Sequence, residues 1–299
     1  MLQKKLLQFG LIAAVAMTSC KKKTTDDDDS GNNNNNVVDP CTQTINKTNG
    51  PVAGTMYILA TDTAFAGDTN LYAATGANST WNFGTLANDK QDTFNFAAPA
   101  TQLLASKFPS ANFIVTEGNN SLAAAGTDSG IVILGAQIPP ILKNITLFPA
   151  FANPATFIPY TLEMNKSQSD GYKASAQIPF DTIITVGFFT LHFDSVRATF
   201  SGSNVFSING CGKITTPSGT YDCLKYKLTP GTMTVKYEGH LYGGAWGDYT
   251  SYANLLGIQT PKIPLINTTG YVWVSKEKGF PVCMVTYDSN GKATVEYLK

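Results

Sequence analysis

The stretch Ser207–Leu228, SINGCGKITTPSGTYDCLKYKL, decides the fold class of this chain. Two segments rich in β-forming residues flank the turn TPSG at Thr216–Gly219, where the fixed φ of proline favours a tight reversal. Short apolar or alternating runs continue on both sides, and Asp170-Gly171 and Asn290-Gly291 are further hairpin signals. The sequence therefore predicts a mainly β protein: a large curved antiparallel sheet or a half-open barrel with few short helices.

The same stretch bears on disulfide pairing. Cys211 and Cys223 each lie six residues from Pro217, so folding about Pro217 places them opposite each other. A cross-strand disulfide is predicted between them if they occupy a close, non-hydrogen-bonded position. Cys41 and Cys283 would then form the remaining pair by elimination. Zinc ligation by these four cysteines is not expected because the CxxC spacing is absent.

Strand signals are densest in the second half of the chain, where Thr182–Phe193 and Asn204–Ile214 are among the predicted strands. The best helix candidates are Ala100–Lys107 and Ser251–Leu256. Residues 51–299 are predicted to form one β-rich body, with a possible softer boundary near residues 165–171, where NKSQSDG interrupts the strand pattern.

The N-terminus has the features of a secretion signal. Residues 1–19 combine two early lysines with an apolar run of about a dozen residues, too short to span a bilayer as a helix. The run ends in Met-Thr-Ser-Cys at residues 17–20, which resembles the lipobox of bacterial lipoproteins. That resemblance implies removal of the first nineteen residues, lipidation of Cys20 and attachment to a membrane through the lipid.

Residues 20–50 are predicted to form a disordered tether. The segment KKKTTDDDDSGNNNNN that follows Cys20 contains no residue suited to a core. About 25 residues of such coil have an average reach of roughly 25–30 Å. Lys21 is not the Asp that holds many lipoproteins at the inner membrane, and the acidic run resembles the surface-export signal of Bacteroidetes lipoproteins. An outer membrane lipoprotein, periplasmic or exposed on the cell surface, is therefore expected; the acidic run is also compatible with a merely solvated linker.

Composition narrows the possible partners. The chain balances 21 basic against 21 acidic residues, and its only arginine is Arg197. Such a neutral body lacks the basic footprint that nucleic-acid binding requires. A GxSxG elbow and a phosphate-binding glycine loop are both absent from the sequence, so no cofactor and no catalytic residue is predicted.

Two further segments carry a resemblance of fold. GCGKITTPSGTYDCLKYKL (210–228) and TGYVWVSKEKGFPVCMVTYDSNG (269–291) are similar to secreted bacterial β proteins of unknown function, some of which form half-open barrels like the LolA and LolB lipoprotein carriers. NSTWNFGTLANDKQDTFNF (78–96) resembles secreted proteins of Bacteroidetes. These motifs concern turns and packing, so the resemblance implies a fold rather than a chemistry.

Both histidines lie beside acidic residues on predicted strands. His192 and Asp194 share one strand face, as do Glu238 and His240, because alternate residues of a strand point the same way. The four side chains would form a weak candidate metal site if the two strands were neighbours. Two polar faces that look at solvent are the alternative, and no metal is predicted.

The segment YEGHLYGGAWGDYTSY, residues Tyr237–Tyr252, places aromatic residues among glycines. Tyr242, Trp246 and Tyr249 are candidate ligand contacts, because exposed rings can stack on a sugar or close over an apolar cavity. Rings that cap the barrel core are the alternative. Thr63, in Asp62-Thr63-Ala64, matches a sequon that resembles the O-glycosylation site of Bacteroidetes proteins.

Three functions remain open at this point. The first is non-catalytic binding of an apolar or amphipathic ligand, a lipid for example, on the concave face of the sheet. The second is a surface module that binds a glycan or a protein through the aromatic Tyr237–Tyr252 segment. A hydrolase, which would need paired carboxylates or the histidines, is the third and has the least support.

Overall fold

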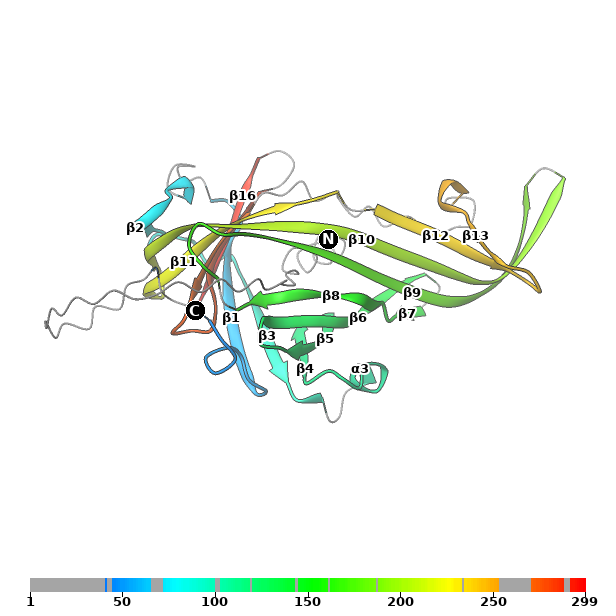
Figure 1. Cartoon of the computed structure of the whole chain (residues 1–299), viewed down its shortest axis with the longest axis horizontal. Helices are drawn as coiled ribbons and strands as arrows, with labels where there is room; N and C mark the ends of the chain where they lie inside the picture. The colour runs from blue at the N-terminus through cyan, green and yellow to red at the C-terminus, as the bar shows by residue number, and fades with distance from the viewer. Residues whose placement is uncertain are drawn as a thin grey trace, which may run out of the picture.

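The computed structural model describes residue 41 and residues 45–65, 72–99, 103–118, 120–142, 145–160, 162–186, 188–232, 234–252, 270–287 and 291–299. Sixteen strands and the short helix α3 (Leu103–Lys107) lie in these ranges (Figure 1). The prediction of a mainly β protein with a large curved antiparallel sheet is confirmed. In the described part of the chain, no helix has the length and apolar character needed to cross a membrane.

Twelve strands form a closed ring. The ring closes because β10 pairs with β9 along one edge and with β11 along the other. In order around the ring the strands are β10 (Phe189–Thr216), β11 (Gly219–Pro230), β14 (Gly270–Ser275), β15 (Phe280–Tyr287), β16 (Ala293–Leu298), β1 (Thr55–Asp62), β3 (Lys90–Ala97), β4 (Phe113–Glu117), β5 (Asn120–Gly126), β6 (Gly130–Leu142), β8 (Ala150–Pro159) and β9 (Ser167–Val186).

Four further strands attach to this ring. β12 (Thr234–Leu241) and β13 (Trp246–Asp248) extend the sheet from β10, and β7 (Ile145–Leu147) pairs with β6. β2 (Gly76–Asn82) pairs with the end of β10 in the parallel direction, so the sheet is not antiparallel throughout.

Aromatic side chains fill the core. The Phe96 ring lies 5.9 to 6.2 Å, centroid to centroid, from the rings of Tyr57, Phe113, Phe157 and Phe280, which come from four other parts of the sheet. Trp81, Phe83 and Trp273 form a second buried aromatic group. Each buried ring removes a large apolar area from water, so these contacts supply much of the energy that holds the ring together.

The hairpin of β10 and β11 turns where the sequence predicts, but its register differs by one residue. Thr216 pairs with Gly219, so Cys211 lies opposite Leu224 and Cys223 lies opposite Gly212. Side chains of neighbouring residues point to opposite faces of a strand, so Cys211 and Cys223 face away from each other. The predicted Cys211–Cys223 disulfide is therefore wrong.

Cys211 is instead joined to Cys41, with 5.1 Å between the two Cα atoms. Cys223 and Cys283 are buried free cysteines, so the predicted Cys41–Cys283 pair is also wrong. Ile45 is buried in the main core. Both Cys41 and Ile45 lie within the range predicted as tether, so the chain contacts the folded body before residue 51.

A long arm leaves the ring. β8 pairs with β9 only up to Ser175, whereas β9 and β10 continue to pair with each other as far as Val186 and Phe189. β12 and β13 lie along the same part of β10, and Figure 1 shows these ribbons extending away from the ring to one side. We call Ala176–Val186, Phe189–Ser201, β12 and β13 the arm.

Candidate functional site

The strand register of the arm arranges polar side chains in rows on one face. Across β10, β12 and β13, Ser195 pairs with His240, which pairs with Trp246. The adjacent row on the same face runs from Arg197 through Glu238 to Asp248. These rows bring the only arginine and one of the two histidines of the chain beside a tryptophan. We call this surface the arm face.

His240 is held between a carboxylate and an aromatic ring. Its Nδ1 lies 2.8 and 3.0 Å from the two carboxylate oxygens of Asp194, which sits at a bulge between Phe193 and Ser195 in the β10 register. The His240 ring lies 5.3 Å from the Trp246 ring. The bulge turns Asp194 toward β12, so this pair depends on an irregularity that regular alternation does not predict.

Arg197 links the acidic and aromatic parts of the arm face. Its Nη2 lies 2.8 Å from Glu238 Oε2, and its guanidinium carbon lies 4.5 Å from the centroid of Trp246. Lys236 donates a 3.0 Å hydrogen bond to the other oxygen of Glu238. The Lys236 bond first, and then Arg197, hold the pKa of Glu238 below its usual value. The carboxylate is therefore ionised and keeps both cations in place.

A second aromatic pair lies toward the end of the arm. Tyr242 stacks on His192 with ring planes 5° apart and centroids 5.0 Å apart. His192 Nε2 is 2.6 Å from Asp181 across the hairpin. Tyr242 is 72 % exposed, so its other ring face and its hydroxyl are open to a partner.

The opposite face of the arm forms a small apolar cluster. Phe193 and Tyr249 meet edge to face at 4.9 Å, and Phe193 and Tyr237 are buried. Gly239 and Gly247 pair across the strands, and a Cβ atom on either would press on these rings. The aromatic segment is thus divided: Tyr237 and Tyr249 stabilise the arm, whereas Tyr242 and Trp246 lie on the arm face.

The four weak metal candidates are brought near one another but not into one ligand set. β10 and β12 are neighbours, as the metal hypothesis requires. However, Asp194 is paired with His240, His192 with Asp181, and Glu238 with Arg197 and Lys236. Among the described residues no group of three or more His, Cys, Asp or Glu side chains could hold a metal ion.

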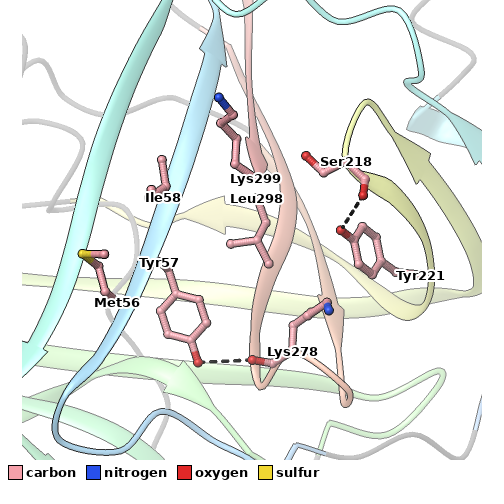
Figure 2. A pocket seen from close by; sticks show the side chains of 8 residues that line it. All are labelled: Met56, Tyr57, Ile58, Ser218, Tyr221, Lys278, Leu298 and Lys299. Atoms are coloured by element: carbon pink, nitrogen blue, oxygen red, sulfur yellow. Dashed lines mark hydrogen bonds between the residues drawn. The ribbon is translucent and has the colours of Figure 1, made fainter.

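A groove on the ring is a second candidate binding feature. It has a volume of about 410 Å³ and lies between β1, the end of β16 and the turns after β10 and β14 (Figure 2). Its lining combines the apolar Met56, Ile58 and Leu298 with the lysines Lys278 and Lys299. The remaining lining residues are Tyr57, Ser218 and Tyr221.

Hydrogen bonds fix the polar edge of this groove. Tyr57 donates its hydroxyl to the Lys278 carbonyl at 3.2 Å, and burial, with Tyr160 as a smaller cause, raises the pKa of Tyr57 to about 12. Lys278 Nζ lies 2.8 Å from Glu277 and 5.5 Å from the Tyr221 ring centroid. Lys278, one of the two lysines that line the groove, therefore already has a carboxylate partner in Glu277.

Thr63 is exposed immediately after β1. Its hydroxyl donates a 2.8 Å hydrogen bond to Asp89, and the same carboxylate accepts the Thr63 backbone N–H. The site is accessible, and its modification stays a prediction. Cys20 lies outside the described residues.

Sequence reasoning found His192, Asp194, Glu238, His240, Tyr242 and Trp246, but it did not identify their partners Arg197 and Asp181. Arg197 was noted only as evidence against nucleic-acid binding, although a single arginine two residues from Ser195 shares the strand face that meets His240. Asp181 was missed because its contact with His192 depends on the position of the hairpin turn.

Comparison of the chain with protein-family models, with curated proteins and with solved structures gives no match.

Proposed function

We propose that this protein is a cell-envelope lipoprotein that binds a glycan through the arm face. One observation carries the proposal: the only arginine and both histidines of the chain lie on one projecting arm beside Trp246 and Tyr242. The rest of the body is poor in charged residues, so this cluster of basic and aromatic side chains on one surface is better explained by ligand recognition than by a role in stability.

The chemistry of the arm face favours a sugar. Sugars present C–H faces that stack on aromatic rings, and hydroxyl groups that need both donors and acceptors. Tyr242 offers an exposed ring, and Trp246 is half-buried between its neighbours. Arg197 and the carboxylates supply charge-assisted hydrogen bonds to hydroxyl groups, and the His240 ring supplies a further hydrogen-bonding nitrogen. The hydrogen bonds among these side chains hold them in place before the ligand arrives, which lowers the entropy cost of binding.

The test is a glycan array probed with the mature chain and with Tyr242→Ala and Trp246→Ala. Loss of a stacked aromatic ring is expected to weaken binding at least tenfold. Met56→Ala is the control, because Met56 is an exposed residue of the ring, away from the arm. A blank array for the wild type, or equal binding by all variants, would contradict the proposal.

The groove on the ring favours a second candidate, the binding of an amphipathic ligand. Met56, Ile58 and Leu298 could contact an acyl chain while Lys299 and Lys278 face an anionic head group. This candidate agrees with the resemblance to half-open barrel carriers. A fluorescent fatty acid should bind saturably, and Met56→Asp should weaken its binding while Tyr242→Ala should not. An absence of saturable uptake would remove this candidate.

Attachment to the outer membrane, on its periplasmic or outer side, belongs to the same proposal. Radiolabelled fatty acid should be incorporated into the wild type and not into Cys20→Ser. The mature wild-type chain should also begin at Cys20 in mass spectrometry. Retention of residues 1–19 would contradict it.

A further inference from the structure

The end of the arm is a two-stranded ribbon with exposed apolar side chains. β12 pairs with β10 only up to Phe193, so Thr182–Val186 and Phe189–Leu191 pair only with each other among the described residues. Phe188 is fully exposed, and Ile183 is 63 % exposed. We call Thr182–Val186 with Phe188–Leu191 the tip.

The tip contains no charged residue, and a cluster of polar and aromatic side chains lies at its base. Its sequence, TIITV followed by FFTL, consists of aliphatic residues, phenylalanines and threonines. Polar side chains begin again at Asp181 and His192, whose Oδ1 and Nε2 atoms lie 2.6 Å apart, and Tyr242 stacks on His192. This order, apolar end and then tyrosine and histidine, matches the change in polarity from the acyl region of a bilayer to its head groups.

We propose that the tip is a membrane contact that inserts Phe188 and Ile183 into the interface of a lipid bilayer. The ribbon has two bare edges, whose backbone groups need water or head groups as hydrogen-bond partners. Insertion is therefore shallow and confined to the end of the hairpin.

The position of the predicted tether supports a bilayer as the occupant. As the coil that the sequence predicts, the 21 residues from Cys20 to Cys41 would have an average reach of about 25 Å. They end at the Cys41–Cys211 disulfide, near the ring end of β10. From Cys211 to Phe189 is 22 residues of β10, at most about 70 Å of strand. A body that lies along the membrane can thus be held at one end by the lipid and at the other by the tip.

The test uses the mature chain, residues 20–299, with Cys20→Ser, so that neither the apolar export signal nor an acyl chain masks weak binding, and vesicles of phosphatidylethanolamine and phosphatidylglycerol. The chain is expected to float with the vesicles, and Phe188→Ser should lower the partition coefficient about tenfold. Ile183→Ser should lower it several-fold. Leu103→Ser is the matched control: Leu103 is 63 % exposed on α3, outside the arm and the groove, so its loss should leave flotation unchanged.

A second readout locates the contact. Phe188→Trp should add fluorescence that brominated lipids quench, beyond any quenching of the chain with Phe188 intact. Failure of the Cys20→Ser chain to float overturns the proposal, as does equal flotation of all variants. Self-association that Phe188→Ser abolishes, without flotation, would show that the tip binds protein instead. Glycan-array binding by the Phe188→Ser variant is independent of these outcomes, so the two proposals fail separately.

Discussion

Lys225 is a fully buried cation with no carboxylate partner among the described residues. Its Nζ donates hydrogen bonds to the carbonyls of Tyr72 at 2.7 Å and Ala74 at 2.5 Å. The rings of Trp81 and Tyr271 lie 5.6 and 4.9 Å from the same nitrogen. Carbonyl dipoles and ring faces stabilise the ammonium only in part, so burial lowers the pKa of Lys225 to about 8.

Lys225 makes the free energy of unfolding change with pH in the alkaline range. A pKa near 8 in the folded state and near 10.5 in the unfolded state means that the unfolded chain binds more protons between these values. The free energy of unfolding therefore rises with pH in this window. In Lys225→Met this rise should be missing. Between pH 7.5 and 10 the free energy of unfolding of the wild type should therefore increase by about 2–3 kcal/mol relative to that of the variant.

Urea unfolding across this range measures the difference. The comparison stops near pH 10 because Tyr57 and Tyr160, whose pKa values burial raises to about 12, favour unfolding once tyrosines of the unfolded chain ionise. Parallel pH profiles for wild type and Lys225→Met would show that the ammonium is not buried as described.

Asp170 has the opposite acid–base behaviour. Its side chain is buried where β9 faces Asn204, and burial raises its pKa to about 6. The folded chain then binds more protons than the unfolded chain between about pH 4 and 6. Asp170 therefore lowers the free energy of unfolding as the pH rises through that window. Asp170→Asn should be more stable than the wild type at pH 7 by up to about 3 kcal/mol.

This advantage should disappear near pH 3, below both pKa values, where the aspartate is protonated in both states. Thermal unfolding at the two pH values is the measurement. A variant that is less stable at both would mean that the charge of Asp170 has a favourable partner.

The disulfides show where residue-level prediction stops. The turn at Thr216–Gly219 was predicted from its own residues, but the pairing of Cys211 depended on whether the hairpin folds about Pro217 or between Pro217 and Ser218. That difference of one residue moves Cys211 to the other face of the strand. Its true partner, Cys41, is 170 residues away in sequence, and no local signal connects them.

At the scale of elements, the arm carries its own small apolar cluster. A Cβ on Gly239 would lie 2.5 Å from Phe193 and 3.2 Å from Tyr249, and the paired Gly247 is equally confined. Phe193, Tyr237 and Tyr249 lie outside the main core cluster. The arm can therefore loosen without unfolding the ring.

Gly239→Ala should destabilise the arm by about 1–3 kcal/mol through overpacking. Hydrogen exchange should quicken in β12 and β13 and change little in the strands of the ring. Gly171→Ala is the matched control, because the nearest atom to its added Cβ lies 3.9 Å away. Uniformly faster exchange over the whole chain would contradict a separate arm cluster.

Strand positions were easier to predict than strand ends. Thr182–Phe193 was predicted as one strand, but it contains the end of β9, the reversal and the start of β10. The run consists almost wholly of β-forming residues, so only Gly187 marks the turn. Asp170-Gly171, predicted as a hairpin turn, lies inside β9, because pairing with Ser203 and Asn204 of β10 overrides the local preference. The β15–β16 hairpin is confirmed, and α3 falls inside the predicted helix Ala100–Lys107.

At the scale of the whole molecule, the closure of the ring could not be predicted from the sequence. Hairpin neighbours such as β4 and β5 follow from local turns, but β1 pairs with β16, and β11 pairs with β14 across a long connection. These pairings depend on shape and on the packing of the aromatic core, which local patterns do not encode. The choice between an open curved sheet and a barrel was therefore left open by the sequence and is settled by long-range pairing.

Removal of the Cys41–Cys211 disulfide should destabilise the whole body. The cross-link closes a loop of 170 residues, and Cys41→Ser or Cys211→Ser should lower the free energy of unfolding by about 2–5 kcal/mol. A reductant should lower the free energy of unfolding of the wild type to that of these variants. Cys223→Ala should keep its sensitivity to the reductant, because Cys223 is a free thiol. Peptide mapping without reduction should find Cys41 joined to Cys211 and to no other cysteine.

The same cross-link has a mechanical consequence. If Cys20 carries the proposed lipid anchor, a force applied there would reach the body at Cys41 and pass through the disulfide directly into β10, the longest of the described strands and one that runs to the end of the arm. The strands between residues 41 and 211 would carry no load along their sequence, since the covalent bridge bypasses them. A molecule fixed at one end to a moving cell envelope could therefore be dragged by its N-terminus without being unravelled from it.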